Sequence, residues 1–152
     1  TVERDGPLGT GSVQHFVDAD FEQHYFSLVG DDAYTEALQR LCLLDVVANN
    51  TDRKGGHCLV DADGNIWGID NGLSFHARFK LRTVIWEWGG EPIPAGMLDD
   101  LASLHEAGPA TAVTEALDSF ERDAILARTR ALLHARAFPI DETGHRYPWP
   151  LV

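Results

Sequence analysis

The stretches Asn-Asn-Thr-Asp-Arg, residues 49–53, and Ile-Asp-Asn-Gly-Leu-Ser-Phe, residues 69–75, decide the fold of this chain. Two short strand-like runs, 57–60 and 66–69, lie between them. They are joined by Asp-Ala-Asp-Gly-Asn, residue types that strongly favour a turn. The sequence therefore predicts a β-hairpin at this point. Each stretch carries one aspartate, and the two aspartates are 18 positions apart on either side of that hairpin.

Asp52 and Asp70 fit the two carboxylate roles of a phosphotransfer site. A kinase needs one carboxylate to orient the acceptor and receive its proton, and a second to hold the magnesium that bridges the nucleotide phosphates. Either aspartate alone is ordinary, because Asp is common in turns and at strand ends. Their spacing around a hairpin, with a helix before it, favours the kinase interpretation, because context is what supports a motif.

A helix is predicted over residues 33–47, just before the first stretch. Apolar residues recur there at three- and four-residue steps, and Asp31 or Asp32 can serve as the N-cap. The helix is expected to end at residues 49–50, since Asn can close a helix in the left-handed conformation. A loop that carries Asp52 then follows.

The second half of the chain is predicted to be mostly helical, after an extended segment and loop over residues 73–88. Three helices are expected: from Pro94 or Ala95 to Ala107, over residues 109–117, and from an Asp118 N-cap to about Ala137. Glu121 stands at the capping-box position of the last helix. The tail, residues 147–150, cannot be helical and is expected to pack its aromatic side chains on the domain.

Composition limits the class of protein. With 152 residues and 44% hydrophobic content, the chain can bury a core as one domain. A net charge of −12 argues against nucleic acid, because such binding depends on Lys and Arg at phosphates. No apolar run approaches the ~20 residues needed to cross a bilayer, and no signal peptide is evident. We therefore expect a cytoplasmic protein without a transmembrane segment.

Other site chemistries find little support. The Asp-rich turn from Asp61 is not an EF-hand, since Ile66 stands where Gly is needed and Gly72 where Glu is needed. Residues 9–14 lack the third glycine of a nucleotide-binding loop, and a strand is expected over residues 13–17. The seven histidines show no zinc-ligand spacing.

Together these motifs resemble the C-terminal lobe of the phosphatidylinositol 3- and 4-kinase-like group, especially the type II 4-kinases and related bacterial kinase-like proteins. The helix, Asn-Thr-Asp-Arg, the hairpin and Ile-Asp-Asn-Gly-Leu-Ser-Phe carry the resemblance, which covers residues 11–76. Gly-Ser-Val-Gln-His-Phe-Val, residues 11–17, is similar to the interlobe hinge of that family. The resemblance implies an α+β, mainly helical fold, the C-terminal lobe of a protein-kinase-like architecture with a catalytic-loop hairpin.

The resemblance also divides the chain, as a single lobe, into three parts. Residues 1–20 would form the interlobe hinge region, 31–76 the catalytic helix, loop, hairpin and metal motif, and 77–152 the acceptor-facing segment and C-terminal helices. The N-terminal lobe would be absent from the chain. The two lysines, Lys54 and Lys80, both follow Asp52, whereas the phosphate-clamping lysine of a kinase lies on an earlier strand. We therefore expect little turnover from this chain alone.

Residue roles follow from the same resemblance. Asp52 would be the catalytic-loop aspartate, Arg53 would help to fix that loop, and Asp70 would bind magnesium between the phosphates of ATP. The adenine pocket would be lined, partly by backbone groups, by Gln14, His15, Phe16 and Val17.

His57 departs from the family pattern. Kinases place an Asn five residues after the catalytic aspartate to hold a second metal. Imidazole suits softer ions such as manganese better than magnesium. His57 is thus either a metal ligand, with Mg or Mn as the ion, or a structural hydrogen-bonding residue.

The sequence predicts an ATP- and metal-dependent phosphotransferase lobe. The acidic charge balance speaks against a membrane-docked lipid kinase, so a protein or small-molecule acceptor is preferred. The alternative is a pseudokinase-type module that binds nucleotide or a partner without catalysis. A helical interaction domain with no nucleotide site would require both aspartate motifs to be coincidental.

Overall fold

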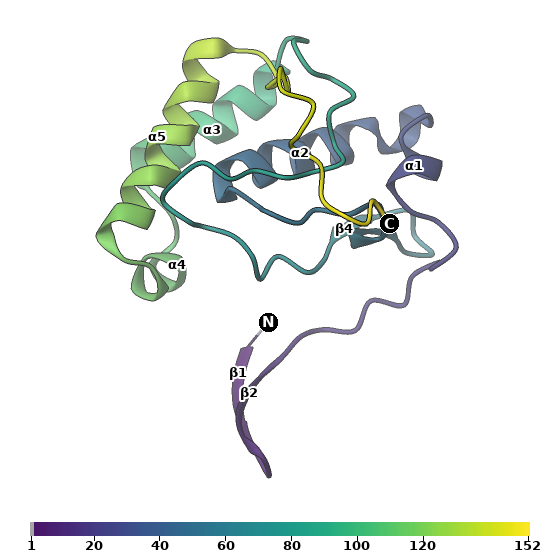
Figure 1. Ribbon diagram of the computed structural model, residues 1–152, viewed down its shortest axis with the longest axis vertical. Helices are drawn as coiled ribbons and strands as arrows, with labels where there is room; N and C mark the ends of the chain where they lie inside the picture. Colours follow the sequence, from purple (N-terminus) through teal and green to yellow (C-terminus); the bar gives the residue numbers. More distant parts are fainter. Residues whose placement is uncertain (1) are drawn as a thin grey trace.

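The computed structural model describes residues 2–152, so Thr1, which falls in the predicted hinge region, lies outside the described residues. These residues form a mixed structure of helices and two small antiparallel sheets (Figure 1). The helices are α1 (Tyr25–Leu28), α2 (Asp32–Ala48), the 3₁₀ turn η1 (Gly55–His57), α3 (Ala95–Ala107), α4 (Thr111–Ala116) and α5 (Ser119–Ala135). The strands are β1 (Val2–Gly6), β2 (Gly9–Val13), β3 (Cys58–Val60) and β4 (Ile66–Gly68).

The hairpin of β1 and β2 extends away from the helices and makes no part of the core (Figure 1). Every residue of both strands is exposed, and Val2 pairs with Val13. The strand predicted over residues 13–17 is therefore wrong, because pairing ends at Val13 and residues 14–18 have no regular structure. A strand needs a partner for its backbone groups, and β1 reaches no further than Val13.

Helix α2 follows the prediction at both ends. Its N-cap is Asp31, whose carboxylate accepts the Ala33 N–H at 2.9 Å. Asn49 closes the helix with φ 55° and ψ 49°, the left-handed conformation that Asn tolerates better than most residues. The Asn49 side chain also donates to the carbonyls of His76 and Arg78 and accepts the Lys80 N–H. One residue thus ends the helix and anchors the long loop that follows the second aspartate motif.

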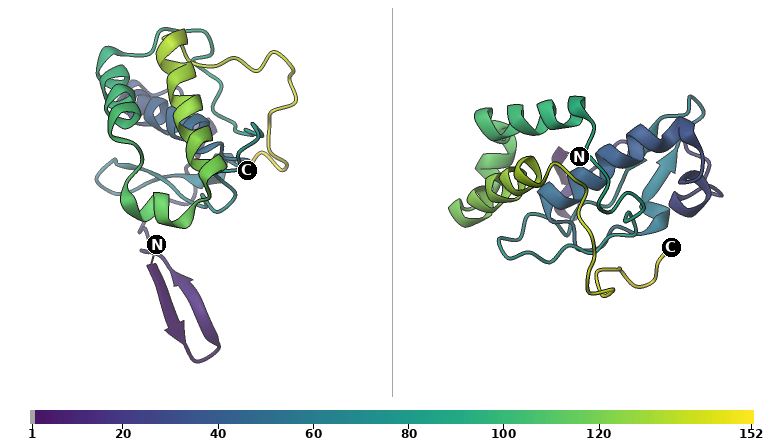
Figure 2. Two further views of the ribbon diagram at one scale, coloured as in Figure 1. Left: turned by 90° about the vertical axis from the view of Figure 1, so that its left-hand side faces the viewer. Right: turned by 90° about the horizontal axis from the view of Figure 1, so that it is seen from above.

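Helices α3 and α5 lie side by side, α5 packs against α2, and an ion pair between Arg40 and Asp100 joins α2 to α3 (Figure 2). The buried apolar residues form one cluster that includes Leu38, Leu41, Val46, Ile85, Leu98, Leu101, Ile125 and Leu132. Among residues 2–152, no helix combines the length and the apolar character that a bilayer span requires.

The predicted catalytic-loop hairpin is present as β3 and β4, in a register that pairs Cys58 with Gly68 and Val60 with Ile66. His57 lies in the 3₁₀ turn instead of the predicted strand, because its N–H bonds back to the Lys54 carbonyl. Gly68 lets the hairpin approach α2, since a Cβ there would lie 2.6 Å from Leu41 Cδ1. The hairpin is therefore seated directly on the helix that precedes it.

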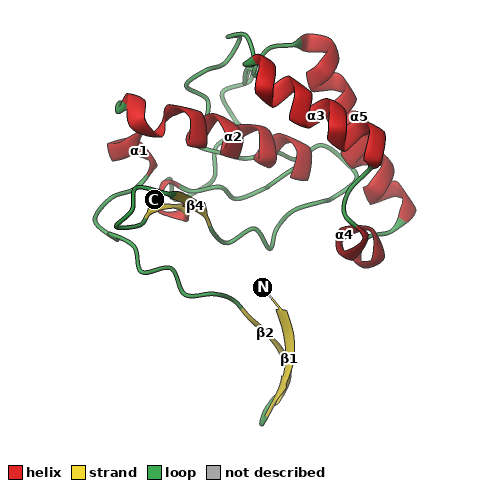
Figure 3. Cartoon of the chain, turned by 180° about the vertical axis from the view of Figure 1, so that it is seen from behind, coloured by secondary structure: helices red, strands yellow, loops and turns green. Residues whose placement is uncertain are grey.

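The C-terminal helices agree with the expected order. Asp118 caps α5 and forms the capping box with Glu121, as predicted. Helix α4 starts two residues later than predicted, and α5 ends at Ala135, before the left-handed Arg136. Two long segments without helix or strand, residues 69–94 between β4 and α3 and residues 136–152 after α5, complete the chain (Figure 3).

The expectation that the tail packs its aromatics is wrong. Trp149 is 88% exposed, whereas Pro148 is buried. Backbone hydrogen bonds hold the tail instead: the Arg146 carbonyl accepts from Thr83, and the Leu151 carbonyl accepts from Gly55 at 2.7 Å.

Candidate active site

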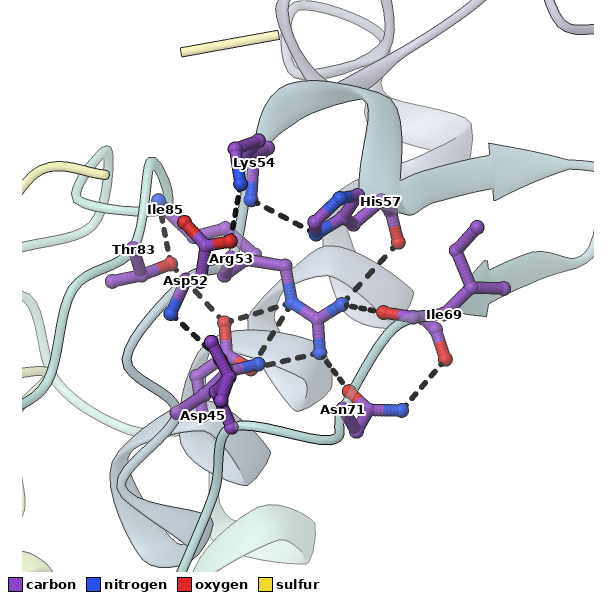
Figure 4. A network of polar contacts seen from close by, with 12 residues as sticks. Asp45, Asp52, Arg53, Lys54, His57, Ile69, Asn71, Thr83 and Ile85 are labelled. Carbon is purple, nitrogen blue, oxygen red and sulfur yellow. Dashed lines mark hydrogen bonds and ion pairs between the residues drawn. The ribbon is translucent and has the colours of Figure 1, made fainter. Parts of the chain in front are cut away.

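Arg53, the residue after Asp52, is fully buried and forms an ion pair with Asp45 on α2 (Figure 4). Its Nε lies 3.1 Å from both carboxylate oxygens of Asp45, and its Nη2 lies 2.9 Å from Oδ1. Charge-assisted contacts of this kind are among the strongest hydrogen bonds in proteins. The loop that carries Asp52 is thereby fixed to the helix before it.

The remaining donors of the Arg53 guanidinium reach the hairpin and the second aspartate motif. Nη1 donates to the carbonyls of Ile69 at 2.6 Å and His57 at 3.3 Å, and Nη2 donates to the side chain of Asn71. Ile69 and Asn71 are the neighbours of Asp70. One buried side chain therefore sets the position of the loop around Asp52 relative to the loop around Asp70.

Asp45 has further buried partners. The side chains of Asn50 and Thr83 each donate to its carboxylate at 3.1 Å, and the Thr83 hydroxyl accepts the Ile85 N–H. Burial raises the pKa of Asp45, whereas the charge and hydrogen bonds of Arg53 act against this shift. Sequence reasoning missed Asp45, although a charged residue inside the apolar run Leu-Cys-Leu-Leu-Asp-Val-Val-Ala was a signal for it.

Asp52 lies at the surface of this framework. Its N–H donates to the Asn50 side chain at 3.0 Å, and its carboxylate, 28% exposed, pairs with the ammonium group of Lys54. Lys54 was also missed by sequence reasoning, which considered lysines only as clamps on an earlier strand. The pair places a partly exposed carboxylate beside a partly exposed cation, on the loop between α2 and the β3–β4 hairpin.

The structure brings His57 and Asp70 together. His57 Nε2 lies 3.5 Å from Asp70 Oδ2, while His57 Nδ1 accepts the Lys54 N–H at 3.4 Å. Burial lowers the pKa of His57, and the charge of Asp70 partly opposes that shift. Because Nδ1 accepts the hydrogen bond from Lys54, a neutral imidazole carries its proton on Nε2, which faces the Asp70 carboxylate. Binding of a metal ion through Nε2 would require the other tautomer.

This pair fits a metal that nucleotide phosphates would help to hold. Within residues 2–152, no group of three or more His, Cys, Asp and Glu side chains converges on one point. Magnesium is usually bound by one or two carboxylates together with substrate phosphates and water. Asp70, with its side chain 64% exposed, has the open coordination that such a site requires.

The predicted adenine-binding segment, residues 14–17, precedes the β3–β4 hairpin in the sequence and runs beside it in space. The His15 ring lies 6.2 Å from the Trp67 ring, and Asp20 N–H bonds to the Val60 carbonyl. Gln14, His15 and Phe16 are exposed, and Val17 is half-buried. Their nucleotide-binding role stays a prediction, on a segment that runs beside the hairpin linking His57 to Asp70.

The family described as "Phosphatidylinositol 3- and 4-kinase" has a model that matches residues 3–115. A curated protein of Mycobacterium tuberculosis (strain ATCC 25618 / H37Rv), "Protein Rv2133c", is 35% identical over 187 residues, which cover 99% of this chain and 67% of that protein. Its name states no activity. No solved structure is similar at a significant level.

Proposed function

Because the chain belongs to the phosphatidylinositol 3- and 4-kinase family, we propose that it is the C-terminal catalytic lobe of an ATP- and metal-dependent phosphotransferase. Residues 1–20 are proposed as the hinge region, 31–76 as the catalytic and metal motifs, and 77–152 as the acceptor-facing part. The observation that carries the proposal is the buried Arg53 side chain, which links the loop of Asp52 to the loop of Asp70.

In the proposed reaction, the acceptor hydroxyl attacks the γ-phosphorus of ATP, the bond from that phosphorus to the β-γ bridging oxygen breaks, and ADP leaves. Asp52 orients the hydroxyl and receives its proton late in the transfer. Lys54, whose ammonium group pairs with Asp52, is the proposed contact to the transferred phosphoryl group. Arg53 has no exposed surface, so it positions Asp52 and touches no substrate.

Asp70 is the proposed ligand of the metal, and His57 the proposed second ligand, with magnesium or manganese as the ion. A bound divalent cation would neutralise charge on the β- and γ-phosphates. Gln14, His15, Phe16 and Val17 are the proposed contacts to adenine. The short distance between His57 and Asp70 supports a shared metal site, because both side chains reach one region from different loops.

A second candidate is a pseudokinase-type module that binds nucleotide or a partner without transfer. His57 favours it, because an imidazole stands where kinases carry the Asn that holds a second metal. The Lys54 contact also favours it, since an ammonium group already occupies the Asp52 carboxylate.

Calorimetric titration of ATP, with magnesium and then with manganese, tests the nucleotide site in the wild type and in Asp70→Asn. Binding that requires metal and is lost in Asp70→Asn supports the proposal, with Asp63→Asn in the exposed hairpin turn as the matched control. ATP hydrolysis that disappears in Asp52→Asn separates the enzyme from the binding module. Absence of ATP binding with both metals, in folded protein that includes an N-terminal lobe, would reject the phosphotransferase and leave a module that binds a partner.

A further inference from the structure

A groove of about 570 Å³ lies between α5 and the segment that follows this helix. Its lining combines a row of alanines on α5, Ala127, Ala131 and Ala135, with residues 137–140 of the next segment. None of the residues that line the groove belongs to either of the two aspartate stretches. The groove is therefore a feature separate from the proposed nucleotide site.

Backbone hydrogen bonds hold the segment after α5 in place. Arg136 ends the helix in the left-handed conformation, with φ 52°. The Phe138 N–H then donates to the Glu91 carbonyl, and the Phe138 carbonyl accepts the Gly90 N–H, both at 2.9 Å. Ile140 packs closely on Gly90, where a Cβ would lie 3.2 Å from Ile140 Cδ1. The groove is thus formed before any ligand arrives, as small-molecule sites usually are.

The lining is apolar apart from two charged side chains, Arg128 and Glu142. Glu142 is exposed, so solvent screens its charge. Arg128 lies on α5 and is only 9% exposed. Phe79 and Ile140 also line the groove, and both keep a large part of their apolar surface exposed. An apolar lining with very few polar groups is the usual composition of a small-molecule site.

Arg128 is a buried cation without a counter-ion. Its Nε donates to the Val47 carbonyl at 2.9 Å, and its Nη1 donates to the His76 carbonyl at 3.5 Å. Its Nη2 is buried without a hydrogen-bond partner, and no ion pair within residues 2–152 includes Arg128. Burial lowers the pKa of Arg128, because desolvation disfavours the charged form.

Arg53, which is also buried, shows what Arg128 lacks. Arg53 pairs with the Asp45 carboxylate and uses all three of its side-chain nitrogens in hydrogen bonds. The Val47 carbonyl lies in the last turn of α2, where the helix dipole offsets only part of a full charge. A buried charge is costly unless it is paired. A carboxylate from a ligand would supply both a counter-ion for Arg128 and an acceptor for its Nη2.

We propose that this groove binds a small amphipathic carboxylic acid, a molecule with one carboxylate and an apolar body. The carboxylate pairs with Arg128, and the apolar body lies along the alanines of α5 and covers Phe79 and Ile140. The volume of about 570 Å³ lies within the roughly 300–1,000 Å³ that is typical of small-molecule sites. The inference does not rest on the proposed phosphotransfer, because it concerns binding alone.

An NMR titration of isotope-labelled protein with octanoate tests the site, and 1-octanol is the uncharged control ligand. Arg128→Met removes the buried charge. Ala131→Phe narrows the groove from an exposed position, so it leaves the core intact. Ala112→Phe makes the same change at an exposed position of α4 outside the groove and is the control variant. Circular dichroism verifies that each variant is folded.

We expect octanoate to bind the wild type and Ala112→Phe equally, and to shift the resonances of α5 and of residues 137–140. Binding to Arg128→Met and to Ala131→Phe should each be at least about ten-fold weaker, because the first loses charge-assisted hydrogen bonds and the second loses space for the apolar body. Octanol should bind the wild type at least about ten-fold more weakly than octanoate does.

Three outcomes overturn the inference. They are no binding of octanoate to the folded wild type, equal binding to Ala131→Phe and Ala112→Phe, and equal affinity for octanoate and octanol. If Arg128→Met does not fold, the comparison of the two ligands still tests the role of the carboxylate, and Ala131→Phe still tests the location of the site.

Discussion

The guanidinium of Arg53 and the carboxylate of Asp45 form an ion pair in which the two side chains are 0% and 1% exposed. Burying such a pair carries a large desolvation penalty, which only good geometry and further hydrogen bonds can offset. Here Asn50, Thr83, Asn71 and two carbonyls provide those bonds. The relation between the two aspartate loops is therefore set from inside the fold, beneath the surface where substrates would bind.

Asp45→Asn should lower the free energy of unfolding by about 3–5 kcal/mol, because it leaves the Arg53 charge buried without a counter-ion. Urea denaturation measures the change. Asp100→Asn is the control, since it breaks the exposed pair with Arg40 and should cost at most about 1 kcal/mol. An equal loss of unfolding free energy in both variants would show that the buried pair contributes no more to stability than the exposed pair does.

Asn49→Ala should destabilise the chain by about 3 kcal/mol, since it strands hydrogen-bonding groups of His76, Arg78 and Lys80 and puts Ala at a positive φ. Asn49→Gly loses the same side-chain bonds but tolerates the backbone conformation, so it should be about 1 kcal/mol less damaging. Denaturation midpoints of both variants check this order. A reversed order would mean that the left-handed φ is not strained in Ala.

In protein that includes an N-terminal lobe, Asp52→Asn should reduce phosphotransfer roughly 10²–10⁴-fold and leave ATP affinity nearly unchanged, because the proton acceptor is lost and the metal site is not. Lys54→Met should also reduce transfer, whereas Lys54→Arg should retain more activity because the charge is kept. Initial rates and ATP titrations on the same preparations provide the measurement. Loss of ATP binding in Asp52→Asn would contradict the assigned division of roles.

His57→Asn should shift the metal preference of ATP binding from manganese towards magnesium, because an amide oxygen is a harder ligand than imidazole. The ratio of ATP affinities with the two metals, measured by calorimetry, is the readout. His145→Asn, an exposed histidine outside the metal site, is the control and should leave the ratio unchanged. An unchanged ratio in His57→Asn would assign His57 a structural role.

Stability should fall at alkaline pH because of two buried thiols. Burial raises the pKa of Cys42 and of Cys58 from 9.0 to about 12. Between these values the native state keeps protons that the unfolded chain releases, so each thiol lowers stability by about 1.4 kcal/mol per pH unit as pH rises.

The double variant Cys42→Ala, Cys58→Ala should show a shallower slope of unfolding free energy against pH above pH 9. Tyr25, whose pKa burial also raises, remains in the variant, so the slope is reduced and not abolished. Denaturation at several pH values gives the slopes, and the two proteins should run parallel below pH 9. Identical slopes above pH 9 would contradict the burial of the thiols.

Local patterns were enough for the features that neighbouring residues control. The capping box of α5 was predicted correctly, and the caps of α2, Asp31 and Asn49, are each one of the two residues expected there, because a cap depends on one side chain and the backbone next to it. The β3–β4 hairpin was predictable for the same reason, since its turn is encoded by consecutive residues. The family was also readable from two short motifs.

Contacts between distant segments were not predictable in this way. The prediction of a strand over residues 13–17 was wrong because β1 pairs only as far as Val13. The prediction that the tail packs its aromatic side chains was wrong because backbone hydrogen bonds hold the tail and leave Trp149 exposed. Asp45 and Lys54 were overlooked because their partners become visible only when the loop folds back on α2.

The sequence by itself determined the family, the order of α2, the β3–β4 hairpin and the C-terminal helices, and the two aspartate motifs, because these depend on residues close together along the chain. Only the tertiary structure decided that Arg53 is a buried link between Asp45 and the loop of Asp70, that His57 faces Asp70, and that the buried Arg128 lines a groove beside α5. These relations depend on long-range packing, which no local pattern specifies.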